Sequence, residues 1–159
     1  MSRTGTTRKV TAVTLRPARL DDSHQVWTWR NDPDTRRASL NSEVIPLTTH
    51  EVWFRDSLRR PDRRIYIVVT DEAESGVVRL DLSGREAEVS IHLDPRWRGR
   101  GVGTLALRAL AAEAFGALGV EALVARVKAD NAASLAAFRA AGFRVEREGD
   151  PVGLVRSRQ

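Results

Sequence analysis

A ten-residue segment in the middle of the chain, Asp94–Gly103 (DPRWRGRGVG), combines residue types that bind phosphate. Its glycines let the backbone approach a ligand closely and its arginines supply positive charge: Gly99, Gly101, Gly103, Arg96, Arg98 and Arg100. A helical pattern begins at Val102, so the first free N–H groups of that helix and the positive end of its dipole would face the same anion. The segment therefore predicts a phosphate or pyrophosphate site; a turn that simply requires glycine is the alternative.

The spacing within this segment excludes two common nucleotide sites. A Walker loop places Lys before Ser or Thr after its last glycine, whereas Gly103 is followed directly by Thr104. A dinucleotide-binding fingerprint reads G-x-G-x-x-G and follows the first strand of a parallel βαβ unit. Here the glycines read G-x-G-x-G after a predicted antiparallel meander, so neither class of site fits.

The predicted strand before this segment carries the residues best suited to move a proton. Alternate side chains of an extended strand share a face, so Glu88, Ser90 and His92 lie on one side. Ile91 and Leu93 lie on the other. A carboxylate or an imidazole can accept a proton near neutral pH. Glu88 is the first choice for this role, with Ser90 and His92 beside it; an exposed carboxylate and a hydrogen-bonded structural histidine are the alternatives.

A second candidate group lies in the first third of the chain. Four aromatic side chains recur at helical spacing, which indicates core packing with at most one ring left to stack on a ligand: Trp27, Trp29, Trp53 and Phe54. Arg30 and Asn31 end the first predicted helix, and His50 lies at the start of the second. An arginine at such a position can bind a phosphate through two nitrogens, or it can cap the helix at the surface.

Hydrophobic periodicity predicts the elements that position these groups. Strands are expected at residues 13–16, 64–70, 76–82, 86–93, 122–127, 143–148 and 152–156. Helices are expected to begin near Asp22, Thr48, Val102 and Asn131, with a polar loop after the first and an apolar face of the second that includes Val52. This order predicts an α/β (α+β) fold with a mixed, mostly antiparallel sheet of about seven strands and four flanking helices.

Length and composition limit the class of protein. At 159 residues, 42% of them hydrophobic, the chain fits one domain, residues 13–159, after a flexible tail at 1–12. It has no apolar stretch of the roughly 20 residues that a membrane span requires. The absence of cysteine excludes disulfides and thiolate metal sites, and no metal is expected. Because no secretory signal precedes the domain, we expect a cytoplasmic protein.

The positive charge of the chain favours anionic ligands. The net charge is +5, and Lys9 and Lys128 are the only lysines, so the other 24 of the 26 basic residues are arginine. These arginines are spread along the chain rather than gathered in one run. A small anionic ligand therefore fits better than the extended footprint of a nucleic acid.

Two motifs at their characteristic separation resemble those of the GNAT superfamily of acetyl-CoA-dependent N-acetyltransferases. Arg98–Gly103 resembles its R/Q-x-x-G-x-G/A motif, and Asn131–Phe143 resembles its N-x-x-S…G-F segment. The resemblance implies that the loop backbone holds the coenzyme A pyrophosphate, and that strands 86–93 and 122–127 splay to admit the pantetheine arm. The coenzyme-binding residues it implies are Ile91, Leu93, Arg98, Gly99, Arg100, Gly101, Val102, Gly103, Thr104, Asn131, Ser134 and Phe138.

The first third of the chain is similar to one subgroup of that superfamily, the PseH-like acetyltransferases of nucleotide-linked amino sugars. The similar residues are Trp29–Pro33 (WRNDP), Arg36, Ser42, His50 and Trp53–Phe54. Ribosomal-protein acetyltransferases of the RimJ and RimL type share parts of this pattern. The resemblance implies that Arg30, Asn31, His50 and Trp53 contact the acceptor substrate.

One position departs from the family pattern. The family commonly has a tyrosine, which protonates the departing thiolate, where this chain has Phe138. Phenylalanine has no proton to donate. The thiolate then leaves without a protein acid, or Ser134 or a water near Asn131 assists, or efficient catalysis has been lost.

Together these features predict transfer of acetyl from acetyl-CoA to a primary amine by direct attack, without a covalent enzyme intermediate. The expected acceptor is the 4-amino group of a nucleotide-linked amino sugar. The alternatives are N-terminal acetylation of a ribosomal protein and a non-catalytic acyl-CoA sensor; a cationic aminoglycoside fits less well, because it prefers an acidic site. Apolar residues after Phe143 predict either a homodimer contact or an edge within the chain.

Overall fold

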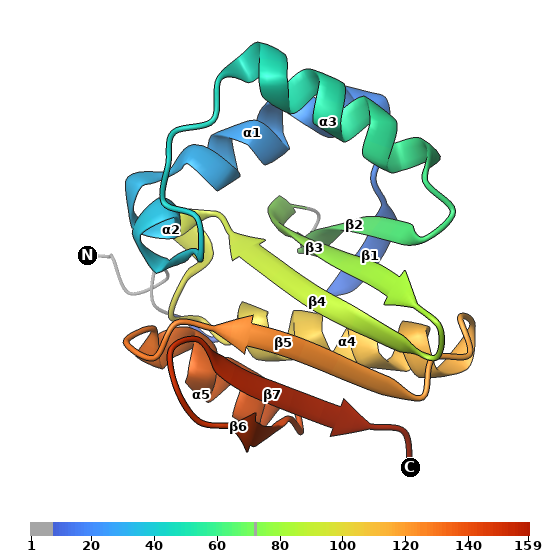
Figure 1. Ribbon diagram of the computed structural model, residues 1–159. Helices are drawn as coiled ribbons and strands as arrows, with labels where there is room; N and C mark the ends of the chain where they lie inside the picture. The colour runs from blue at the N-terminus through green and yellow to red at the C-terminus, as the bar shows by residue number, and fades with distance from the viewer. Residues whose placement is uncertain (1–7, 72) are drawn as a thin grey trace.

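The computed structural model describes residues 8–71 and 73–159, which form one mixed sheet flanked by helices (Figure 1). Its strands are β1 (Thr14–Pro17), β2 (Arg63–Thr70), β3 (Ala73–Ser83), β4 (Glu86–Leu93), β5 (Ala122–Val127), β6 (Arg144–Arg147) and β7 (Val152–Ser157). They pair in the order β1-β2-β3-β4-β5-β7-β6, and every neighbouring pair is antiparallel except β4 and β5. The predicted mixed, mostly antiparallel sheet of about seven strands is confirmed.

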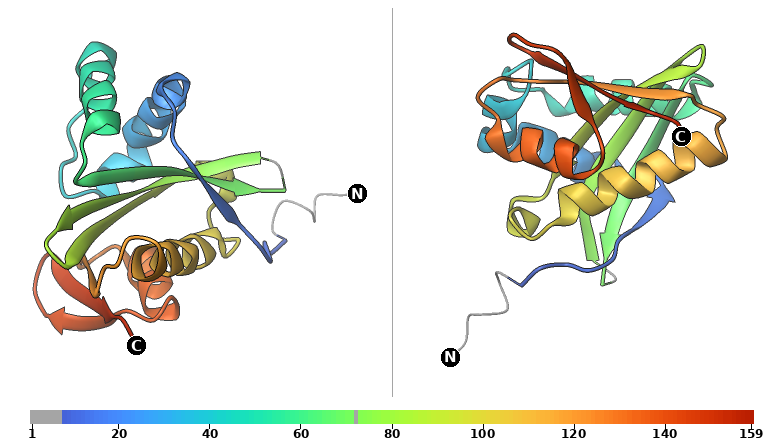
Figure 2. Two further views of the ribbon diagram at one scale, coloured as in Figure 1. Left: turned by 90° about the vertical axis from the view of Figure 1, so that its right-hand side faces the viewer. Right: turned by 90° about the horizontal axis from the view of Figure 1, so that it is seen from below.

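The helices of the described residues cover both faces of this sheet. They are α1 (Ser23–Asn31), α2 (Pro33–Ala38), α3 (Leu47–Arg59), α4 (Val102–Gly116) and α5 (Ala132–Ala140), with 3-10 turns at Leu20–Asp22 and Pro95–Trp97. Figure 2 shows α1 and α3 over one face, and α4 and α5 over the other. Each face has its own core: Trp29, Phe54 and Ile67 on the first, and Leu107, Leu110 and Leu123 on the second. None of these helices is long and apolar enough to cross a membrane.

Helix α2 occupies a segment that was expected to be a polar loop. Asp32 caps it, because its Oδ2 accepts a hydrogen bond from the Thr35 N–H at 3.1 Å, and Pro33 takes the first helical position. A capping aspartate followed by proline is an established signal for the start of a helix. The prediction overlooked this signal.

Helix α3 differs from its prediction at its start and on its apolar face. Pro46 is the N-cap residue, so neither Thr48 nor Thr49 caps the helix. Phe54 is completely buried, whereas the side chain of Val52 is 49% exposed. Two residues along a helix correspond to a rotation of about 200°, so Val52 and Phe54 face opposite directions. The placement of Val52 on the apolar face was wrong.

Strands β4 and β5 separate along their length. Among the described strands they are the only parallel neighbours, and the pairing joins Glu86–Glu88 to Ala122–Val124. Beyond Glu88, β4 continues to Leu93 paired with β3. Figure 1 shows the two arrows diverging toward their carboxyl ends. The divergence leaves one edge of Val89–Leu93 without a strand partner, which is the splay that the resemblance implied.

Both ends of the described chain pack against the domain. The Val10 N–H donates a hydrogen bond to the Arg100 carbonyl at 2.8 Å, beside the loop that precedes α4. Residues 1–7 of the predicted flexible tail lie outside the described residues. In β7, Val152, Leu154 and Val155 are buried between β5, β6 and the helices of this chain, so they contribute to its own core.

Candidate active site

The backbone at the start of α4 offers the hydrogen-bond donors that an anion requires. Gly101 is the N-cap residue at φ +85°, a conformation that residues with a Cβ rarely adopt. The first hydrogen bond back along the helix runs from the Leu105 N–H to the Gly101 carbonyl. The N–H groups of Val102, Gly103 and Thr104 therefore have no partner within the helix and face outward at its positive end. This geometry fits the pyrophosphate of coenzyme A.

The arginine side chains of the same loop are occupied elsewhere. The Arg96 guanidinium donates to both carboxylate oxygens of Asp94 at 3.0 Å. Arg100 donates through Nε to the Arg8 carbonyl at 2.9 Å, and its guanidinium lies 4.3 Å from the centre of the Trp97 ring. Both residues were predicted to add charge to the anion site, but here each side chain contacts another part of the protein.

Arg98 joins this loop to the start of α2. Its Nη2 donates to Asp32 Oδ2 at 3.0 Å and to the Thr35 hydroxyl at 2.5 Å. These two residues form the N-terminus of α2, so the guanidinium of Arg98 holds that helix. The charge of Arg98 is therefore paired within the protein.

A buried carboxylate ties α1 to the same loop. Asp94 is 5% exposed, and its Oδ2 accepts a hydrogen bond from the Trp29 indole at 2.9 Å. The hydrogen bonds from Arg96, and then that from Trp29, lower the pKa of Asp94 to about 2. The carboxylate stays charged at neutral pH and fixes the loop against the core. No local pattern predicts this contact, because Trp29 and Asp94 are 65 residues apart.

The second motif forms the start of α5. Asn131 caps this helix, since its Oδ1 accepts a hydrogen bond from the Ser134 N–H at 3.2 Å, as predicted. A Cβ built on Gly103 would lie 3.6 Å from the Cβ of Ala137, so α5 packs closely against the start of α4. Phe138 is 2% exposed and meets Phe143 edge to face at 4.9 Å. Phe138 is thus a core residue here.

The predicted proton-handling residues share one face of β4. The register with β3 places Glu88 opposite Asp81, Ser90 opposite Arg79 and His92 opposite Val77. Glu88 lies where β4 and β5 begin to diverge, and its Oε2 is 2.7 Å from Nε of Arg126 on β5. The Ser90 hydroxyl accepts a hydrogen bond from Arg79 at 3.3 Å. Ile91 and Leu93 pack toward the core beneath α4, on the opposite face.

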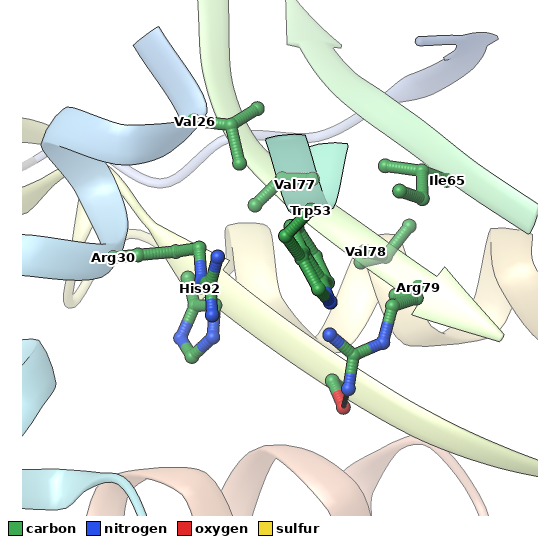
Figure 3. Close-up of a pocket in the computed structure, with 9 residues that line it drawn as sticks. Val26, Arg30, Trp53, Ile65, Val77, Val78, Arg79 and His92 are labelled. Carbon is green, nitrogen blue, oxygen red and sulfur yellow. Dashed lines mark hydrogen bonds between the residues drawn. The ribbon is translucent and has the colours of Figure 1, made fainter. Parts of the chain in front are cut away.

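Ser90 and His92 line a pocket on the face of the sheet that α1 and α3 cover (Figure 3). The other walls come from α1, α3, β2 and β3, and the lining residues are Val26, Arg30, Trp53, Ile65, Val77, Val78 and Arg79. The structure therefore brings Arg30 and Trp53 together with two of the β4 residues. Arg79 is a pocket residue that sequence reasoning missed; strand alternation and the β3–β4 hairpin register were the signals that could have found it.

Arg30 is the central cation of this pocket. Its guanidinium lies 4.2 Å from the centre of the Trp53 ring, and its Nη1 is 3.0 Å from Nδ1 of His50. His50 is completely buried, and its Nε2 lies 2.9 Å from the Ser23 carbonyl. Since a carbonyl only accepts, Nε2 carries the proton and Nδ1 accepts from Arg30. Burial, and then the charge of Arg30, lower the pKa of His50 to about 4, so this histidine is a neutral support.

The charge of this pocket is not balanced. Asp81 pairs with both Arg63 and Arg79, at 2.6 and 3.1 Å, and each of these guanidinium groups lies 5.5 Å from the Trp53 ring. Among the described residues, no carboxylate lies within ion-pair distance of Arg30. Burial, and then the charges of Arg79 and Arg63, lower the pKa of Arg30 to about 10. A half-buried cation without a counter-ion fits an anionic ligand.

Asn31 does not line this pocket, and its side chain instead holds the loop before α3. Its side-chain nitrogen donates to the Ile45 carbonyl at 2.8 Å, and its oxygen accepts from the Ile45 N–H at the same distance. The Trp27 indole donates to that carbonyl at 2.7 Å. Asn31 and Trp27 therefore anchor the connection between α2 and α3. Groups of three or more side chains suited to a metal ion are absent from the described residues.

Comparisons with known proteins identify the family and the fold of the chain. Residues 12–144 match the sequence profile of the acetyltransferase (GNAT) domain, a range that includes the α4 loop, the β4 face and the start of α5. The aminoglycoside acetyltransferase AAC(6')-Ib, in complex with paromomycin and acetyl-CoA, has a TM-score of 0.83 at 18% identity over 94% of this chain and 95% of its own. No curated protein matches the sequence.

Two further solved structures share the fold. Spermidine N-acetyltransferase from Vibrio cholerae, in complex with CoA and spermine, has a TM-score of 0.82 at 16% identity, over 91% of this chain and 95% of its own. A provisionally assigned phosphinothricin N-acetyltransferase has a TM-score of 0.76 at 25% identity, over 92% of this chain and 98% of its own. The fold is therefore common to proteins named for different acceptors, and it does not by itself identify the acceptor of this chain.

Proposed function

The chain belongs to the GNAT acetyltransferase family and is an N-acetyltransferase that uses acetyl-CoA, and we propose that its acceptor is a phosphate-bearing amine, the 4-amino group of a nucleotide-linked amino sugar. One observation carries this proposal. Arg30 faces the acceptor-side pocket beside Trp53 and Arg79, and no described carboxylate pairs with it. A diphosphate would supply the missing negative charge and accept hydrogen bonds from the guanidinium groups.

The same charge argues against polycationic acceptors. Paromomycin and spermine, which the two structural neighbours bind, carry several ammonium groups. Such a molecule would meet like charge at Arg30 and Arg79, which costs binding free energy. The basic N-terminus of a ribosomal protein, the alternative acceptor, would meet the same repulsion. A non-catalytic sensor is not needed to explain a chain that is an acetyltransferase.

On the coenzyme side, the residues fit acetyl-CoA. The N–H groups of Val102–Thr104, with Gly101 at a positive φ, would hold the pyrophosphate. The free edge of β4 beyond Glu88 can form backbone hydrogen bonds to the pantetheine amides. The acetyl group is then supplied as a thioester near the diverging ends of β4 and β5, next to the acceptor-side pocket.

Acetyl transfer requires that the amine lose a proton before it attacks the thioester carbon. Glu88 and His92 lie on the pocket face of β4 and are the candidates to accept that proton, directly or through water. The chain has no cysteine, in agreement with direct attack. Because Phe138 is buried in the core, we propose that the coenzyme thiolate leaves without an acid from α5.

A second acceptor class shares the required charge. Phosphinothricin is an amino acid that carries a phosphinate and a carboxylate, and the protein provisionally assigned to its acetylation is 25% identical to this chain. An anion of this kind would also pair with Arg30. A small anionic amino acid is therefore the second candidate acceptor.

The test is coenzyme A release from acetyl-CoA with separate acceptors: a nucleotide-linked 4-amino sugar, phosphinothricin, a basic ribosomal N-terminal peptide and an aminoglycoside. We expect release with the nucleotide-linked sugar, and a loss of that release in Arg30→Gln. Release with phosphinothricin alone would support the second candidate. Release only with the peptide or the aminoglycoside would contradict an anionic acceptor.

A further inference from the structure

His92 lies in the same pocket as the two arginines that face the acceptor. The imidazole comes from β4, Arg30 from α1 and Arg79 from β3, and Figure 3 shows the three side chains turned toward one pocket. No described residue forms a hydrogen bond to the His92 ring. The ring is therefore available to a substrate group, unlike that of His50, whose two nitrogens are both engaged.

The groups around His92 are predominantly cationic. Arg30, Arg79 and Arg98 face it from α1, β3 and the α4 loop, while Trp53 on α3 is uncharged. Two carboxylates on this face of β3 and β4 are already paired, Asp81 with Arg63 and Arg79, and Glu88 with Arg126, while the exposed Glu86 lies at the opposite end of β4 from His92. Burial, and then these three positive charges, lower the pKa of His92 to about 4. The imidazole is neutral at pH 7 but is a weak base.

We propose that the anionic group of the acceptor enables His92 to accept the proton of the acceptor's own amine. This inference rests on the proposed function, since it assigns the acceptor's phosphate to the space beside Arg30 and Arg79. Negative charge there offsets the two guanidinium groups, so a positive charge on His92 costs less free energy. The bound substrate thereby makes His92 a stronger base for the substrate's own amine.

The proposed step balances in protons and electrons. One N–H proton of the acceptor ammonium moves to a free nitrogen of His92, which becomes imidazolium and later releases that proton to water. The neutral amine attacks the thioester carbon, the C–N bond forms, and the C–S bond breaks with its electron pair on sulfur. The second proton lost by nitrogen neutralises the coenzyme thiolate, so acetyl amide and coenzyme A are the products.

This arrangement selects acceptors by rate as well as by affinity. An amine without an anionic group leaves the field of Arg30 and Arg79 unchanged, so His92 remains a weak base even when the amine is bound. Glu88 already has a cationic partner, because its carboxylate is 2.7 Å from Nε of Arg126. We therefore expect acceptors with an anionic group and acceptors without one to differ in kcat and not only in KM.

The test is a histidine NMR titration that needs no acceptor. The chain has three histidines, and the signal of His92 is identified by its loss in His92→Gln. The titration is made on the coenzyme A complex, so that the α4 loop is occupied, with and without inorganic pyrophosphate. We expect pyrophosphate to raise the pKa of His92 by about one unit or more. The exposed His24, which does not line the pocket, serves as the internal reference.

Variants at Arg30 test whether the charge or the shape of this side chain lowers the pKa of His92. Arg30→Gln should raise the pKa of His92 without pyrophosphate, whereas Arg30→Lys, which keeps the charge, should leave it low. Arg79→Gln is the second variant if Arg30→Gln does not fold. The proposal is overturned if pyrophosphate fails to bind the coenzyme A complex, if it binds without moving the His92 titration, or if both glutamine variants leave that titration unchanged.

These outcomes are independent of the acceptor's identity. A shift of His92 without acetylation of the nucleotide-linked sugar would support this inference and contradict that acceptor. Acetylation of the sugar without a shift of His92 would leave the proposed function in place and overturn the role of His92.

Discussion

The loop before α4 and the pocket around Trp53 both concentrate arginine, yet they use it differently. In the loop, Arg96 and Arg98 bind carboxylates of the protein, and Arg100 binds a carbonyl and stacks on Trp97. In the pocket, Arg30 has only a neutral histidine and an aromatic face as partners among the described residues. The loop thus presents backbone donors to an anion, while the pocket presents a side-chain charge.

This difference shows that arginine content alone does not locate an anion site. A guanidinium group paired with a carboxylate has its charge and donors satisfied, so it stabilises the fold. A guanidinium group that is half-buried without a counter-ion has lost part of its hydration and has gained no ion pair in return. An anionic ligand can supply that ion pair. Anion binding at the loop before α4 should therefore tolerate the loss of arginine, and anion binding at the pocket around Trp53 should not.

Arg30→Gln gives the largest expected effect. We expect kcat/KM for the anionic acceptor to fall about 100-fold, since hydrogen bonds to a charged group contribute about 1.5–3 kcal/mol. The dissociation constant of coenzyme A should not change. Steady-state kinetics and calorimetry measure these values, with the exposed Arg59→Gln at the end of α3 as the matched control. Equal losses in both variants would remove the distinction between pocket and surface arginines.

A negative charge placed in the loop before α4 tests whether that loop binds the coenzyme pyrophosphate. Gly101→Asp and Gly101→Asn have nearly the same shape, both tolerate positive φ, and no atom lies closer than 3.8 Å to the new Cβ. Aspartate repels the pyrophosphate, so we expect coenzyme A to bind about 30-fold more weakly than to the asparagine variant. Similar affinities for the two variants would place the pyrophosphate elsewhere.

His92→Gln should lower kcat at pH 7 more than tenfold, with little change in coenzyme affinity, because it removes the proposed proton acceptor. The comparison is Glu88→Gln, which exchanges the other candidate proton acceptor on this face of β4 for its neutral amide. Rate measurements across pH 5–9 check both variants. A larger loss for Glu88→Gln would return the role to the carboxylate.

Asp94 makes the attachment of the loop dependent on pH. Its pKa is lowered to about 2 in the folded protein, from an ordinary value of 3.8. The stabilisation is therefore complete above the ordinary value and is lost as the pH falls toward 2. Asp94→Asn should reduce the free energy of unfolding by about 2 kcal/mol at pH 7. Urea unfolding at neutral and acidic pH should show that difference shrink, while the exposed Asp21→Asn shows none.

Arg98→Gln should give the smallest effect and separates fold from coenzyme binding. The variant loses the ion pair with Asp32, which is partly exposed, so we expect a loss of about 1 kcal/mol and a decrease in Tm of about 2–4 °C. Coenzyme affinity should change less than about threefold. A collapse of coenzyme binding, without the loss of Tm, would assign the charge of Arg98 to the pyrophosphate instead.

Much of the fold followed from local patterns. The alternation in 86–93 located β4 with both ends correct, and Asn131 was identified as the cap of α5. These features depend on backbone conformation and hydrogen bonds within a few residues, so the sequence specifies them directly. Helix α2 and the orientation of Val52 were missed, although the Asp32–Pro33 pair and helical geometry carried the information.

The site itself was predicted only in part. Arg30, His50 and Trp53 were all selected, and the structure places them in contact; Asn31, selected with them, holds the connection to α3 instead. Arg79 was overlooked because a charged residue in a strand gives no sign of its neighbours until the register of the sheet is known. The sequence pattern predicts on which face of a strand a side chain lies, but not which group that side chain contacts.

The sequence by itself determined where the chain turns, which segments form helices and strands, and where backbone N–H groups are free at the start of α4. Only the tertiary structure decided which charges are satisfied. Arg98 meets Asp32 across 66 residues, and Arg30 meets a neutral His50 across 20. Whether a guanidinium group pairs with a carboxylate depends on how distant elements pack. That packing distinguishes an arginine that stabilises the fold from one that has no counter-ion among the described residues.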